Sequence, residues 1–252
     1  MAEKHPYSIS PSSLQISLPF RMILSGSSGA GKSHFIMELI DKEYYMFSEP
    51  VSAIYYFYVT MNSTIKKISK MPKVILKNGF SLDQVSGHDG ETHIWVIIDD
   101  HLTRPIYHDL ANLFANNSRA QNISVTLLTQ NMYTKAGNAA KFNREVLVNR
   151  THSVVFPCRQ DDAMVQAMAR NSSIPYSRIM GAYHLSSNSK ITGEEFGVDD
   201  NADEDIESDD EHTKRQRHSH LLIQFTPGTK PELELRSKIF FMEETTELFW
   251  PL

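Results

Sequence analysis

The chain has 252 residues, a net charge of −5 at pH 7 and a single cysteine. This length suits one α/β domain, or a domain with a small appendage. One cysteine excludes an intramolecular disulfide framework, and no Cys/His spacing typical of zinc is present, so we expect a reducing compartment. Because we find no signal peptide and no apolar run of membrane-spanning length, we expect a soluble intracellular protein without a membrane segment.

Apolar runs of strand length alternate with helical segments along the chain, which is typical of a parallel sheet. We predict strands at about residues 20–25, 53–60, 73–77, 94–99, 123–129 and 152–157, and helices at about 32–42, 61–70, 105–117, 138–148 and 160–170. Near the C-terminus, the runs 220–225 and 233–241 flank a turn that contains Pro and Gly. They predict a hairpin or a strand-loop-strand unit that closes the sheet edge.

Residues 26–33 have the sequence GSSGAGKS and lie between the first predicted strand and an amphipathic helix. In this pattern the glycines let backbone N–H groups point at phosphate oxygens, and the helix N-terminus adds partial positive charge. We expect Lys32 to reach the outer phosphates and the Ser33 hydroxyl to bind Mg²⁺. ATP and Mg²⁺ are the predicted cofactors, and the predicted nucleotide-binding residues are Gly26, Ser27, Ser28, Gly29, Ala30, Gly31, Lys32, Ser33 and His34.

A second motif lies at the end of the predicted strand 94–99, where Asp99 is the last strand residue and Asp100 follows it. At a strand tip the first carboxylate can hold Mg²⁺, usually through water, and the second can polarise the attacking water. Two acids after a strand could also mark a simple turn. The gap between the motifs leaves room for additional strands, a feature of P-loop ATPases whose second acid is catalytic. Most of those enzymes have Glu where this chain has Asp100. Because the Asp side chain is shorter, the attacking water would have to lie closer to the backbone of this residue.

Two polar residues flank the predicted strand 123–129. Gln130 follows its tip, where an amide could sense the γ-phosphate or simply cap a turn. Arg119 lies four residues before the strand and after a predicted helix. In a ring, an arginine there could reach the neighbour's nucleotide as an arginine finger; the alternative is a surface arginine in a loop. Other candidates for this role, which could instead line a DNA channel, are Arg144, Arg150 and Arg159.

The negative charge is concentrated in one segment. Eleven acidic residues and no Lys or Arg lie between Glu194 and Glu211, so the rest of the chain has 25 basic and 19 acidic residues, a net charge of +6. A mildly basic remainder fits a polyanion-handling protein. The segment should be a disordered loop. It is a solvated linker, a nuclear-import patch with the basic run that follows, or a strip that mimics nucleic acid.

The chain is accordingly divided into an N-terminal arm (1–17), a P-loop core (18–193), an acidic and basic loop (194–218) and C-terminal strands of the same domain (219–252). The expected fold is an α/β P-loop NTPase of the additional-strand, catalytic-acid type. Its central sheet is mostly parallel and flanked by helices, and a β-hairpin-like extension follows at the C-terminus.

Together these motifs resemble the FtsK/HerA-type ATPases, and in particular the genome-packaging ATPases of double-stranded DNA viruses and of Polinton or adintovirus elements. The resemblance covers about residues 18–170 and 219–241. Its most specific part is the block 113–131, in which Arg119 is followed by the sequences Asn-Ile-Ser-Val and Leu-Thr-Gln-Asn. The phosphate loop alone occurs in many unrelated families and is not specific. The acidic segment does not belong to the shared pattern.

The resemblance implies a homo-oligomeric ring of five or six subunits that uses ATP to move double-stranded DNA into a capsid. Lys32, Asp100, Gln130 and Arg119 would act in catalysis, and Ser33 and Asp99 at the metal. A capsid or portal component is the implied further partner. The implied site of action is an infected host cell, in the nucleus or a cytoplasmic viral factory, or the virion itself.

Two other classes of protein stay open. A small-molecule or nucleoside kinase uses the same phosphate loop on a chain of this size, but it has lid arginines and a shaped acceptor pocket. It needs neither an arginine before a strand nor a glutamine at its tip. The other class is a non-catalytic DNA-binding regulator with a nucleotide fold, against which the intact Lys32, Ser33 and acid pair argue. A GTPase is disfavoured because no Asn-Lys-x-Asp motif occurs.

Overall fold

The computed structural model describes residues 14–85, 90–99, 107–130, 138–156, 165–166, 168–169, 172–188, 220–226, 229–230, 234–237, 239 and 247–248. Within these ranges one sheet has the strand order β3-β2-β4-β5-β1-β6-β7-β8-β9. Strands β1 to β6 pair in parallel, and β7, β8 and β9 are added antiparallel. The bounds are β1 Arg21–Ser25, β2 Ala53–Tyr58, β3 Val74–Asn78, β4 Ile94–Asp99, β5 Ile123–Thr129, β6 His152–Val155, β7 Leu221–Gln224, β8 Leu235–Ser237 and β9 Glu247–Leu248.

Helices cover both faces of this sheet because the parallel strands are apolar on both sides. On one face, Leu24, Tyr56 and Ile97 pack in the cluster that contains the buried residues of α2 and α4. On the other face, Ile23 and Val96 pack with residues of α5, η3 and α7. The helical elements are α2 Lys32–Asp41, α3 Glu43–Met46, α4 Ser63–Ile68, η1 Leu82–Gln84, α5 Tyr107–Asn112, η3 Leu113–Asn117, α6 Ser118–Ala120, α7 Asn138–Asn149 and α9 Tyr176–Asn188.

The six predicted parallel strands are all present, as are helices at 32–42, 61–70 and 138–148. The predicted helix 105–117 differs at its end. It passes through a π-helical turn, η3, and continues into α6, so Arg119 lies on a helix rather than after one. Of the predicted helix 160–170, the described residues 165–166 and 168–169 are helical. The predicted arm and charged loop lie mostly outside the described residues.

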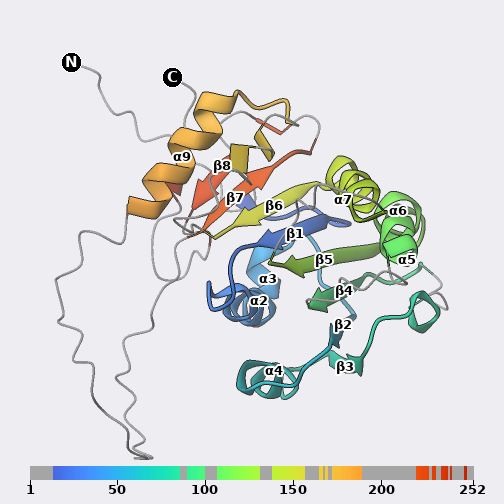
Figure 1. Cartoon of the computed structure of the whole chain (residues 1–252). Helices are drawn as coiled ribbons and strands as arrows, with labels where there is room; N and C mark the ends of the chain where they lie inside the picture. The colour runs from blue at the N-terminus through green and yellow to red at the C-terminus, as the bar shows by residue number, and fades with distance from the viewer. Residues whose placement is uncertain are drawn as a thin grey trace, which may run out of the picture.

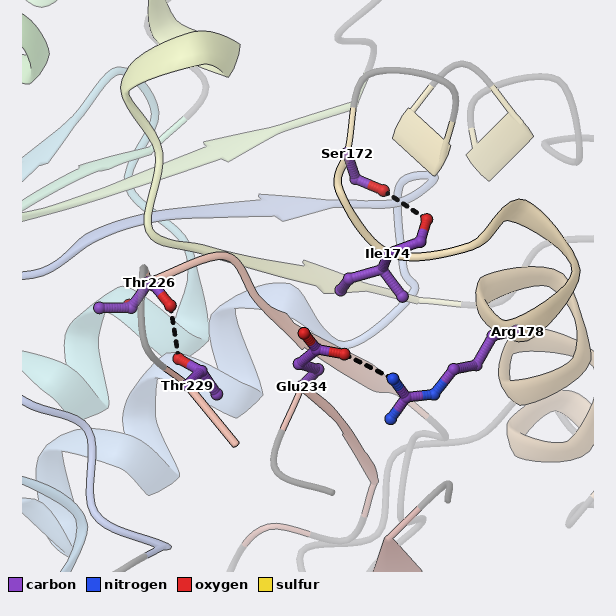
Figure 2. Close-up of polar contacts among 6 residues, drawn as sticks. All are labelled: Ser172, Ile174, Arg178, Thr226, Thr229 and Glu234. Atoms are coloured by element: carbon purple, nitrogen blue, oxygen red, sulfur yellow. Dashed lines mark hydrogen bonds and ion pairs between the residues drawn. The ribbon is translucent and has the colours of Figure 1, made fainter. Parts of the chain in front are cut away.

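The C-terminal strands form the expected extension, and α9, which the sequence did not predict, packs against them. Ile179 and Tyr183 of α9 share an apolar cluster with Leu221 and Leu235. Arg178 also forms an ion pair with Glu234, directly before β8 (Figure 2). An internal glycine and several serines lower the helix propensity of α9. Its i, i+4 apolar spacing was the available signal.

None of the helices in the described ranges has the length and apolar character needed to span a bilayer.

Candidate nucleotide-binding site

The glycine-rich loop joins β1 to α2, as its sequence predicts, and two of its glycines are required by geometry. A Cβ atom on Gly26 would lie 2.8 Å from Cβ of Phe156, so only glycine lets the loop pass the end of β6. Gly31 caps the N-terminus of α2 with a φ of 96°, in the left-handed region that glycine adopts without strain. These two positions turn the chain tightly from strand to helix.

Lys32 folds back over this loop. Its Nζ atom donates hydrogen bonds to the carbonyl oxygens of Gly26, at 2.7 Å, and Ser27, at 2.8 Å. The side chain therefore holds a positive charge at the mouth of the loop, where the helix N-terminus also contributes partial positive charge. Such a site favours phosphate oxygens.

A pocket of about 680 Å³ lies at the carboxyl edge of the sheet. Asp99 and Gln130 line it together with the loop. Its loop residues are Ser28, Gly29, Gly31, Lys32, Ser33 and His34, whereas Gly26, Ser27 and Ala30 are not part of the lining. The structure therefore brings most of the predicted nucleotide-binding residues to one cavity.

Asp99 and Gln130 reach this cavity because of the strand order. Strand β5 lies between β1 and β4, and the parallel register places Ser25 beside Thr129 and Leu128 beside Asp99. The carboxyl ends of three strands thus meet at the edge where the loop begins. A strand inserted between the loop strand and the acid strand is the arrangement expected for the additional-strand type of P-loop NTPase.

Asp99 has a partner that sequence reasoning missed. The hydroxyl of Tyr56 on β2 donates a hydrogen bond of 2.7 Å to Oδ2 of Asp99. Burial, followed by the negative charge of Asp99, raises the pKa of Tyr56, while a hydrogen bond with Ser33 acts in the opposite direction. The phenol therefore stays neutral and remains a donor. No signal in the sequence separates Tyr56 from an ordinary core tyrosine.

The segment that follows β2 was also missed. Val59, Thr60, Asn62, Thr64 and Ile65 line the pocket on the side formed by β2 and α4. The Asn62 side chain caps α4 by accepting a hydrogen bond of 2.9 Å from the backbone N–H of Ile65. A polar segment with an Asn cap directly after a strand was the signal that could have indicated this part of the wall.

The donors at the pocket fit Mg²⁺. Ser33 and Asp99 offer a hydroxyl and a carboxylate, the hard oxygen ligands that Mg²⁺ prefers. Mg²⁺ usually keeps several waters and uses one or two carboxylates together with substrate phosphates. Within the described ranges no group of three His, Cys, Asp or Glu residues could hold a metal ion. Two protein ligands are compatible with a nucleotide-bound Mg²⁺.

The remaining predicted residues lie elsewhere. Asp100 and Arg159 are outside the described residues. Arg119, of which only the backbone is described, lies on α6 where β5 begins, at the opposite end from Gln130 (Figure 1). Arg150 is buried, donates to the Leu147 carbonyl and lies 4.2 Å from the ring centroid of Phe225. Its proposed role as a finger or DNA contact is therefore wrong, because its guanidinium packs inside the fold.

The strand order and the loop together define a P-loop NTPase fold with an additional strand. No family model and no curated protein matches the chain. Among solved structures, the chain is similar to the cytoplasmic domain of EssC, with 14% identity and a TM-score of 0.39 over 50% of this chain and 30% of that one. It is also similar to EssC ATPases 2 and 3 from Geobacillus thermodenitrificans, with 13% identity and a TM-score of 0.38 over 54% and 32%.

The chain thus spans less than a third of either solved structure. The assignment to this fold class rests on the strand order and the phosphate loop.

Proposed function

We propose that this protein is a Mg²⁺-dependent ATPase of the FtsK/HerA type that translocates double-stranded DNA, in the packaging of a viral genome into a capsid. The observation that carries the ATPase part is the meeting of Lys32, Ser33, Asp99 and Gln130 at one pocket, on a sheet with β5 between β1 and β4. The packaging part rests on the sequence resemblance.

Each residue has a defined role in this proposal. Lys32 and the loop N–H groups bind the phosphates of ATP, and Ser33 and Asp99 hold the metal. Mg²⁺, when bound, would neutralise charge that develops on the transferred phosphoryl group. Asp100, the next residue after Asp99, polarises the attacking water, and Gln130 senses the γ-phosphate from the tip of β5. A five- or six-membered ring would supply Arg119 from a neighbouring subunit.

A run of lysines that extends from α4 to β3 supports the DNA part of the proposal. No acidic residue lies between Glu49 and Asp83, and Lys66, Lys67 and Lys70 are exposed. The complete set is Lys66, Lys67, Lys70, Lys73 and Lys77, of which Lys73 forms an ion pair with Glu43. Lys77 lies on the edge strand β3, where a lysine also discourages strand pairing between molecules. A binding experiment distinguishes this role from contact with DNA.

ATP hydrolysis should rise strongly when long duplex DNA is added at low salt. The physical reason is that a translocase couples turnover to a bound DNA backbone, which it contacts without sequence preference. The measurement is steady-state phosphate release with and without duplex DNA, with Lys32→Ala as the blank. Turnover that is indifferent to DNA would favour the kinase class and a search for a small acceptor. No turnover at all would favour the non-catalytic regulator.

Replacing Lys66, Lys67 and Lys70 together by Gln should weaken duplex binding equally for all sequences. Each lost phosphate contact lowers the slope of log affinity against log salt by about 1, so the slope should fall by up to about 3. The measurement is a binding titration at several salt concentrations. Lys230→Gln, which removes an exposed lysine between β7 and β8, is the matched control. A wild-type slope in the triple variant would show that DNA binds elsewhere.

A further inference from the structure

Tyr56 lies at the centre of the site although its side chain belongs to the core. It is fully buried on β2 and shares the apolar cluster between the sheet and the helices α2 and α4. In the parallel register Tyr56 pairs with Ile97 of β4, so Asp99 is two residues further along that strand. Side chains two residues apart on a strand share a face, and a diagonal neighbour is within reach of an aromatic side chain.

The Tyr56 hydroxyl connects the core to the tip of the acid strand. It donates a hydrogen bond of 2.7 Å to Oδ2 of Asp99, the last residue of β4. Asp99 and Ser33 are the two protein groups that fit Mg²⁺. The phenol therefore contacts the carboxylate of this pair without lining the pocket itself.

A buried tyrosine hydroxyl needs a polar partner in any protein, and a purely structural role would satisfy that need with any nearby acceptor. Here the acceptor is the carboxylate whose orientation a metal site depends on. Hydrogen bonds to a ligating carboxylate fix its direction, and their loss typically costs 10–100-fold in metal affinity or activity. The aromatic ring that carries this hydroxyl is also held rigidly, because it is packed in the core.

We propose that Tyr56 is a positioning residue for the Mg²⁺ site: its hydroxyl holds the Asp99 carboxylate in the orientation that binds the metal of the Mg²⁺–nucleotide complex. This inference rests on the proposed function, since it assumes that the pocket takes a Mg²⁺–nucleotide.

The test compares Tyr56→Phe with Tyr55→Phe. Both variants remove one phenol oxygen from β2, but Tyr55 packs on the opposite face of the sheet. Binding of a fluorescent ATP analogue is measured in EDTA and then during titration with Mg²⁺. For Tyr56→Phe, the Mg²⁺ concentration that gives half of the metal-dependent gain in affinity should rise about 10–100-fold. The affinity in EDTA should stay within about twofold of wild type, and Tyr55→Phe should match wild type in both measurements.

The outcomes separate this inference from the proposed function. If wild-type binding does not respond to Mg²⁺, the Mg²⁺–nucleotide function is wrong, and the positioning role with it. If wild type responds and Tyr56→Phe has the same Mg²⁺ dependence, only the positioning role is wrong. Equal weakening in EDTA and in Mg²⁺ would indicate a structural role and also overturn it.

A double variant guards against a loss of packing in Tyr56→Phe. In an Asp99→Asn background the carboxylate is gone, so adding Tyr56→Phe should change the Mg²⁺ dependence by less than about twofold. A full additive effect would show that Tyr56 acts independently of Asp99 and would contradict the proposal.

Discussion

Lys32→Ala should lower the affinity for Mg²⁺–ATP by at least about 100-fold. Hydrogen bonds from a charged donor contribute roughly 1.5–3 kcal/mol each, and Lys32 is placed to make more than one to phosphate oxygens. Each 1.4 kcal/mol corresponds to about tenfold in affinity. The substitution also removes the two hydrogen bonds to the carbonyls of Gly26 and Ser27, so the loop loses a contact that helps to shape it.

The matched control for this prediction is Lys42→Ala. Lys42 follows the same helix and forms an i, i+4 ion pair with Glu38 at 2.9 Å. Pairs of this kind contribute about 0.3–0.5 kcal/mol, so this variant should fold and bind ATP as wild type does. Isothermal titration calorimetry with Mg²⁺–ATP measures both. An affinity of Lys32→Ala within about threefold of wild type would show that the loop does not bind phosphate through this residue.

Arg119→Ala should bind ATP normally and lose about 10³-fold or more in turnover, because an arginine finger contributes 10³–10⁵ to the rate. The fold supports action in trans. Arg119 lies at the start of β5 and the pocket at its end, and seven strand residues span roughly 20 Å. A head-to-tail ring would bring this end of one subunit to the pocket of the next.

Mixing two inactive variants tests whether the sites are shared. In an equal mixture of Arg119→Ala and Lys32→Ala, up to roughly a quarter of the interfaces in a ring pair an intact loop with an intact arginine. Turnover should therefore recover in the mixture, although neither variant is active alone. A mixture that stays inactive would contradict the shared site. Lys230→Gln, which removes an exposed lysine between β7 and β8, should leave turnover unchanged and serves as the control.

The local features of this protein could be predicted from its sequence because their signals are local. The glycine pattern at 26–31 specifies a loop that only small residues can form, and the apolar runs of β1, β4 and β5 are strand-length and bounded by polar residues. Asp99 and Gln130 follow such runs directly, so their places at strand tips could be predicted too. The internal glycine in α9 weakened the same kind of signal, and that helix was missed.

Only the tertiary structure decided which of these strand ends lie side by side in the sheet. Local patterns do not encode the pairing of parallel strands that are distant in the chain. The spacing of the two motifs led us to expect an inserted strand, and the structure identifies it as β5, between β1 and β4. The place of Tyr56 at the site also depends on strand pairing. In the sequence Tyr56 is adjacent to Tyr55 in one apolar run. Only the pairing of β2 with β4 shows that Tyr56 faces Asp99 and that Tyr55 lies on the other face of the sheet. Sequence by itself determined the chemistry available at the pocket and placed Arg119 before β5, whereas non-local strand pairing decided which side chains share the pocket.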